Sequence, residues 1–297
     1  MDVEKRKHYL KIINAGALTA IVDQAIKRNP TEQKKPSGNS WYSVSLGSFG
    51  EGSAVALVPA NVVKPDGTVD FVFTFKSIGP GDKSTAAKTG VNAVFVTCYV
   101  SEAGSAKHTL LFGTSSFVSN SVAKVLADLK NKYPDKTLKP GKVALTSWSG
   151  GYGPVRQILS ERASLASKGI EISSVVLADG LHSSGKALEP FIQFAREAAK
   201  DPSKRFTTIT TGVDPGSYIS STKASKLVSE AVGGVQEREW NGVGAAPEAT
   251  HGSGGYQHIE LWKPGPYSEA TMKGQHAGAY RWTNENKGNL AHLLGWD

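Results

Sequence analysis

The segment 142–159 constrains the fold more than any other part of the chain, because its pattern predicts a buried strand that turns sharply into a helix. It reads KVALTSWSGGYGPVRQIL. The apolar run Val143–Leu145 is typical of a buried strand, and Pro154 suits the first turn of a helix. Apolar residues then recur at helical spacing as far as Leu159. Ser149 therefore lies at the turn itself, with glycines directly after it.

Strands and helices alternate along most of the chain, which predicts right-handed crossovers and a largely parallel sheet, that is, an α/β fold. The strands after the turn should end at the same edge of the sheet as the turn, and ligands bind at that edge in open α/β sheets. The predicted strands are 41–46, 54–59, 69–75, 92–100, 143–145, 173–178, 206–211 and 256–262, with 110–113 as a further short apolar piece. The predicted helices are 119–133, the helix after the turn, 188–200, 223–232 and a last one within 277–294.

Two segments stand apart from this alternation. Residues 5–28 have an apolar stripe at helical spacing, and the polar, proline-bearing stretch 29–40 reads as a loop or linker. We therefore expect an N-terminal helix and linker over residues 1–40 and a single domain over 41–297. The glycine-rich segment 242–255 is predicted to be a mobile loop, which could act as a lid over a site.

The charge pattern argues against a nucleic-acid partner. The chain of 297 residues has 34 Lys and Arg against 26 Asp and Glu, a net charge of +8, but the positive residues are scattered rather than gathered in an aromatic-interleaved stripe. We expect no nucleic acid, while contact with an acidic surface such as a cell-wall polymer remains open.

The cysteine, the histidines and the apolar runs argue against disulfide-linked, metal-binding and membrane-spanning proteins. A single cysteine, Cys98, lies in an apolar run, so it predicts a buried core thiol and no intrachain disulfide. The seven histidines lack metal-site spacing, and we expect neither a metal nor another cofactor. No run is as long as a membrane span, and no clear signal peptide is present. A cytoplasmic protein is the default expectation, and an excised domain of a longer protein fits equally.

The turn carries a resemblance to a known family. Ser147-Trp148-Ser149-Gly150-Gly151 resembles the Gly-x-Ser-x-Gly nucleophile turn of the α/β-hydrolase superfamily, with Ser147 in place of the first glycine. The other reading is a glycine-rich loop whose serines only cap the next helix. The resemblance implies a mostly parallel central sheet flanked by helices in a three-layer sandwich, with Ser149 as the nucleophile of a serine esterase or lipase.

A serine nucleophile needs a histidine base and an orienting carboxylate. Asp179 directly follows one predicted strand and Asp214 follows the next, and the tight Ala178-Asp179-Gly180 junction favours Asp179, with Asp214 as the alternative acid. Glu189 is a more distant candidate.

For the base, the resemblance favours His276, which follows the last predicted strand and lies just before the predicted terminal helix. His258 lies within a strand, His251 in the glycine-rich loop and His182 three residues beyond Asp179. These three histidines stay open as alternatives.

The remaining parts of such a site are an oxyanion hole and a pocket. The backbone amide of Gly150 would supply one donor, and Ser77 or Ile78, in the loop after the strand 69–75, the other. Trp148, Tyr152 and His182 are candidate pocket residues, although such side chains are more often part of the core.

The resemblance therefore implies a cofactor-independent hydrolase that cleaves a small-molecule or polymer-borne ester through an acyl-enzyme. An amidase or an acyltransferase would use the same residues. A binding protein that kept the fold and lost the chemistry, or an interaction module that docks on an acidic polymer, are the other classes. A dinucleotide site is disfavoured, because the glycines after Ser149 do not follow the Gly-x-Gly-x-x-Gly spacing.

Overall fold

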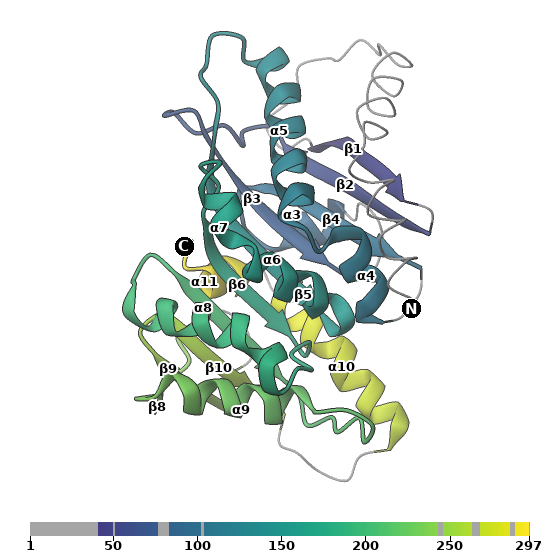
Figure 1. Ribbon diagram of the computed structural model, residues 1–297, viewed down its shortest axis with the longest axis vertical. Coiled ribbons are helices and arrows are strands. Elements are labelled where there is room, and N and C mark those ends of the chain that lie inside the picture. The colour runs from purple at the N-terminus through teal and green to yellow at the C-terminus, as the bar shows by residue number, and fades with distance from the viewer. Residues whose placement is uncertain are drawn as a thin grey trace. The chain divides into compact units, whose positions relative to one another are not determined.

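The computed structural model describes residues 41–49, 51–76, 83–101, 104–242, 246–262, 268–285 and 289–296. Within these residues a single ten-stranded sheet has the order β1-β2-β4-β3-β5-β6-β7-β10-β9-β8 (Figure 1). The pairs from β4 through β10 are parallel, whereas β1 and β2 on one side and β9 and β8 on the other are antiparallel. The predicted mostly parallel sheet is confirmed, with antiparallel strands at its two edges.

The strands follow the predicted positions closely. Each predicted strand overlaps an observed one, and the short hairpin of β8 and β9 is an addition. The strands are β1 (Trp41–Phe49), β2 (Gly52–Pro59), β3 (Thr68–Phe75), β4 (Val94–Val100), β5 (Lys139–Trp148), β6 (Ile172–Ala178), β7 (Arg205–Thr210), β8 (Gln236–Glu237), β9 (Ala249–Ser253) and β10 (Tyr256–Glu260).

Helices cover both faces of the sheet, in three layers. Side chains of α4, α5, α6, α7, α8 and α9 pack on one face, where alternate residues of β3 such as Phe71, Phe73 and Phe75 point. Side chains of α3, α10 and α11 pack on the opposite face with Val72 of the same strand. The helices are α3 (Lys83–Lys88), α4 (Ser105–Phe112), α5 (Ser115–Lys132), α6 (Tyr152–Ser160), α7 (Arg162–Ala166), α8 (Glu189–Lys200), α9 (Ser221–Val232), α10 (Glu269–Asn284) and α11 (Asn289–Leu294).

This arrangement is the predicted three-layer sandwich, with a mostly parallel sheet between two layers of helices. The central strands are buried on both faces, which explains their continuous apolar runs, since a parallel sheet with helices on both sides exposes neither face to water. Cys98 lies in β4 with its thiol free and fully buried, as predicted.

The apolar piece 110–113 lies at the end of helix α4, which begins at Ser105. Two expectations need correction. The segment 242–255, predicted to be a mobile loop, contains β9, which pairs with β10 and thereby extends the sheet. The terminal helical region consists of α10 and α11, and α10 begins at Glu269, before the range predicted for a helix.

The expected N-terminal helix and the linker 29–40 lie outside the described residues. Among the helices that the structure describes, none combines the length and the apolar character needed to cross a bilayer.

Candidate active site

Three residues in strained backbone conformations lie together at the carboxyl edge of the sheet. Lys76, Ser149 and Asp179 directly follow the adjacent parallel strands β3, β5 and β6, with φ values of 59°, 52° and 42°. No other non-glycine residue that the structure describes has a positive φ. Each such residue costs about 1–3 kcal/mol, and strain of this kind persists mainly where function needs it. The edge of β3, β5 and β6 is therefore the candidate active site.

The register of the sheet brings these residues together. Phe75 in β3 pairs with Ser147 in β5, and Trp148 in β5 pairs with Ala178 in β6. The residues that directly follow these pairs therefore lie side by side at one edge of the sheet, although they are far apart along the chain.

Ser149 begins a short 3₁₀ turn, η1 (Ser149–Gly151), that leads straight into α6. The turn is packed tightly against its neighbours. A Cβ atom on Gly151 would collide with the carbonyl oxygen of Phe75, and one on Gly180 would lie 2.9 Å from the carbonyl oxygen of Ser149. Glycine is required at both positions because other backbone atoms occupy the space that a side chain would need.

Ser147 occupies the position of the first glycine in the Gly-x-Ser-x-Gly pattern and lies near the end of β5, just before the turn. Its side chain is 4% exposed, and its hydroxyl has no hydrogen-bond partner within the part of the chain that the structure describes. The substitution thus leaves a buried polar group unsatisfied without displacing Ser149.

The buried Asp179 forms a hydrogen bond with His276, which is itself partly exposed. His276 Nδ1 lies 2.7 Å from Asp179 Oδ2, and Asp179 is 2% exposed. The same carboxylate accepts a hydrogen bond of 2.8 Å from the Thr211 hydroxyl and another from the Ser221 hydroxyl. Burial alone would raise the pKa of Asp179, but the hydrogen bonds from His276, Ser221 and Thr211 outweigh it and hold the pKa below its usual range.

The hydrogen bond between these two groups fixes the position of one proton. An ionised carboxylate can only accept hydrogen bonds, so Nδ1 of His276 carries the proton that points at Asp179. In the neutral form of such an imidazole Nε2 has the free lone pair, which is the tautomer that a general base needs.

Trp148 holds the backbone next to this histidine. Its indole Nε1 donates a hydrogen bond of 2.8 Å to the carbonyl oxygen of His276, and the two rings lie 4.9 Å apart between centroids. The residue directly before Ser149 therefore ties β5 to α10, the helix that carries His276.

The position of His276 differs from the prediction. It was expected just before the terminal helix, but it lies inside α10, whose N-cap is Ser268. Gly274 and Gly278 both lie within this helix, and a Cβ atom on Gly278 would come within 2.8 Å of the Trp262 ring.

Asp214, the alternative acid, does not contact the histidine. Its carboxylate accepts hydrogen bonds of 3.0 Å from the backbone amide of Gly216 and from Lys223 Nζ, in an exposed turn. The other candidate acid, Glu189, is exposed at the start of α8, where its carboxylate accepts a hydrogen bond from the Gln193 side chain. The structure thus brings Asp179, and neither alternative, to His276.

The other candidate histidines have different surroundings. His258 is buried in β10 with its Nε2 3.1 Å from the Thr210 hydroxyl, and burial lowers its pKa to about 3. His251 was predicted in a mobile loop, but it lies in β9 directly opposite His258. His182 Nδ1 lies 3.0 Å from the carbonyl oxygen of Ile219.

The predicted oxyanion donors are only partly described. Gly150 lies in η1, where a Cβ atom would come within 3.1 Å of the backbone of Gly104 and Ser105 at the start of α4. Ser77 and Ile78 lie outside the described residues.

Two of the predicted pocket residues belong to a row of aromatic rings. Tyr152 contacts His182 with ring centroids 5.9 Å apart, and His182 contacts Tyr218 at 5.0 Å. These three residues follow β5, β6 and β7, so the row runs along the edge of the sheet away from Ser149. Tyr218 is 57% exposed and was missed by sequence reasoning, although a tyrosine in the otherwise polar stretch DPGSYIS was a usable signal.

Lys76 is the second residue that the sequence reasoning missed. Its ammonium lies 3.0 Å from the Ser149 hydroxyl oxygen and 5.5 Å from the centroid of a Trp148 ring. Its position directly after the buried run FVFTF is visible in the sequence, although the predicted oxyanion donors are the two residues that follow it.

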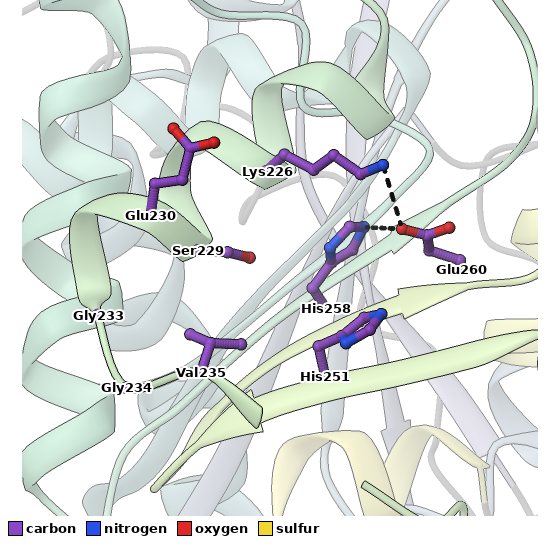
Figure 2. A pocket seen from close by; sticks show the side chains of 9 residues that line it. All are labelled: Lys226, Ser229, Glu230, Gly233, Gly234, Val235, His251, His258 and Glu260. Carbon is purple, nitrogen blue, oxygen red and sulfur yellow. Dashed lines mark ion pairs between the residues drawn. The ribbon is translucent and has the colours of Figure 1, made fainter. Parts of the chain in front are cut away.

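A cavity of about 420 Å³ lies elsewhere, between α9, β9 and β10 (Figure 2). Three of its lining side chains approach one another: Lys226 Nζ lies 3.9 Å from a Glu260 oxygen, and the same oxygen lies 4.0 Å from His258 Nε2. Ser149, Asp179 and His276 do not line it, whereas the alternative histidines His251 and His258 do. Across the described ranges, no group of three or more candidate side chains could hold a metal ion.

Comparisons with known proteins give weak similarities. No protein-family model and no curated protein matches the chain. Among solved structures, an esterase from Pyrobaculum calidifontis is 12% identical with a TM-score of 0.38, covering 99% of this chain and 92% of that one. An IroE-like serine hydrolase from Shewanella oneidensis is 11% identical, with a TM-score of 0.45 and coverage of 86% and 88%. An S-formylglutathione hydrolase from Agrobacterium tumefaciens is 12% identical, with a TM-score of 0.40 and coverage of 86% and 99%. Similarities this low assign neither an activity nor a residue role to this chain.

The packing around Ser149 predicts opposite effects for two glycine substitutions. Gly151→Ala should lower the free energy of unfolding by about 1–3 kcal/mol, because the new methyl group meets the backbone of Phe75. Gly274→Ala, in α10, should raise it by about 0.5–1 kcal/mol, since the site is open and alanine favours a helix. Urea unfolding followed by circular dichroism measures both, and an equally stable Gly151→Ala variant would contradict the tight turn.

Proposed function

We propose that this chain is a serine hydrolase that cleaves carboxylic esters through an acyl-enzyme intermediate. Ser149 is the nucleophile, His276 the general base and acid, and Asp179 the carboxylate that orients His276. The observation that carries this proposal is the hydrogen bond between the buried carboxylate of Asp179 and His276, a histidine whose backbone is tied to the residue before Ser149. Together with the strained turn at Ser149, this pair supports an activated nucleophile.

Acylation proceeds by transfer of the Ser149 proton to Nε2 of His276 while Oγ forms a bond to the substrate carbonyl carbon. The electron pair of the carbonyl moves onto its oxygen, which becomes the oxyanion. When that pair returns, the bond to the leaving alcohol breaks, and the alcohol takes the proton from His276. Asp179 keeps its negative charge throughout and stabilises the imidazolium that forms.

Deacylation repeats these steps with water. A water molecule gives a proton to His276 and attacks the acyl carbon, and Ser149 then takes that proton back as the acid product leaves. No cofactor enters either half of the reaction. The same groups would cleave an amide or a thioester, or pass the acyl group to another alcohol. An ester is proposed over an amide because an ester is the more reactive of the two toward a serine hydroxyl.

The row of Tyr152, His182 and Tyr218 supports a substrate with an apolar or ring-bearing part. Rings at these positions offer aromatic faces and edges along the same edge of the sheet, and the exposed ring of Tyr218 lies at the outer end of the row. A small molecule or the side group of a polymer would both fit this description.

An activated serine can be tested without knowledge of the substrate. A fluorophosphonate probe should label the wild-type protein stoichiometrically on Ser149, because only a serine with a base reacts quickly with it. Ser149→Ala should abolish the label, His276→Ala should abolish or greatly slow it, and His251→Ala serves as the matched histidine control that labels normally. Peptide mass spectrometry locates the label. Absence of label on folded wild-type protein would favour a binding protein that kept the fold without the chemistry.

The two candidate acids give a second test. Asp179→Asn should slow labelling by about 10³–10⁴-fold, because an amide in this place no longer holds His276 in the required tautomer. Asp214→Asn removes the same charge from an exposed turn and should leave the rate unchanged. Stopped reactions at several probe concentrations give the rate constants, with melting curves as the check on folding. The reverse result would assign the acid to Asp214.

A further inference from the structure

Backbone pairing with the strands on either side, β4 and β5, holds Lys76 next to Ser149. Its own amide donates a hydrogen bond of 3.1 Å to the carbonyl oxygen of Cys98 in β4, and the preceding residue pairs with β5. The positive φ of Lys76 turns the chain out of the strand at this point. The side chain is therefore positioned by the register of three neighbouring strands rather than by chance contact at a surface.

The charge of Lys76 has no carboxylate partner among the residues that the structure describes. Its ammonium contacts the Ser149 hydroxyl oxygen at 3.0 Å and lies near the Trp148 ring, and the side chain is half-buried. Burial lowers the pKa of Lys76.

His108 is a titratable group that the charge of Lys76 affects. It lies in α4 and is fully buried, with its Nδ1 2.9 Å from the carbonyl oxygen of Gly104. Burial lowers the pKa of His108, and the charge of Lys76 lowers it further. His108 therefore supplies no negative charge that could compensate Lys76.

A cation placed this way suits a negative charge that exists only during the reaction. We propose that Lys76 is a catalytic residue whose ammonium donates a hydrogen bond to the oxyanion formed when Ser149 attacks the carbonyl carbon. This inference rests on the proposed function. The oxyanion is bonded to the same carbon as Oγ, so a donor within 3.0 Å of Oγ lies within reach of it.

The proton balance of the reaction is unchanged by this role. The Ser149 proton still passes to His276, and Lys76 keeps all its protons from the resting state to the acyl-enzyme. In the resting state Oγ accepts a hydrogen bond from Lys76, which leaves the hydroxyl proton available for a base. Lys76 would add a charged donor to the backbone amide of Gly150, in a site where the two other predicted donors are not described.

The first test measures how fast the fluorophosphonate probe labels each variant, because a phosphonyl oxygen gains negative charge in that reaction as the carbonyl oxygen does in ester cleavage. Lys76→Met should slow labelling by about 10²–10³-fold, the loss typical of one oxyanion donor. Lys223→Met removes a lysine paired with exposed Asp214 and should label at the wild-type rate. Lys76→Arg keeps the positive charge but cannot act as a base, and should label within about tenfold of wild type.

The second test restores the charge chemically. Lys76→Cys should label as slowly as Lys76→Met, and alkylation with 2-bromoethylamine should recover most of the rate because it rebuilds an ammonium of nearly the same length. Alkylation with iodoacetamide, which adds a neutral group, should recover none. Cys98 is fully buried and stays unmodified in both reactions, which mass spectrometry checks.

The outcomes separate this inference from the proposed function. A wild-type protein that takes no label overturns both. Normal labelling of wild type and of Lys76→Met overturns the role of Lys76 alone. A slow Lys76→Arg variant combined with a fast aminoethylated protein would make Lys76 a base and overturn its role as a cationic donor. Equal rates after both alkylations would likewise overturn it.

Discussion

The close approach of backbone segments at the carboxyl ends of β3, β5 and β6 is the constraint on which the candidate site depends. Gly151 lies against the carbonyl oxygen of Phe75, and Gly180 lies against Ser149, so the three strand ends meet with no side chain between them. The strain at Lys76, Ser149 and Asp179 is the cost of this arrangement, and the buried parallel sheet beneath supplies the stability that offsets it. Reactive groups from three loops thereby come together on a rigid base.

Much of this could be predicted from sequence, because the signals were local. One contiguous segment contains the strand, the turn and the following helix around Ser149. The alternation of strands and helices along the chain predicts the parallel sheet. The choice of Asp179 over Asp214 also rested on a local feature, the tight junction with Gly180, and the structure places Asp179 against His276. Residues that end neighbouring parallel strands must lie at one edge, so their grouping follows from the fold class alone.

The remaining features depend on contacts between distant segments. Nothing local indicates that Lys76 reaches Ser149, since the two are 73 residues apart and meet only through the register of β3 with β5. His276 was placed outside the helix, whereas the cap at Ser268 and the hydrogen bond from Trp148, 128 residues away along the chain, stabilise an α10 that includes it. β9 was missed because an edge strand gains its stability from pairing with β10, not from its own glycine-rich sequence.

The bond from the Trp148 indole reaches the main chain of residue 276, not its imidazole. Any amino acid at that position offers the same carbonyl, so the anchoring of α10 beside β5 is independent of whether a base is present. Descendants of such a chain could lose the histidine in one step and still hold α10 beside β5. The architecture thus allows a chain that has this imidazole and one that lacks it to share one fold and differ by a single codon.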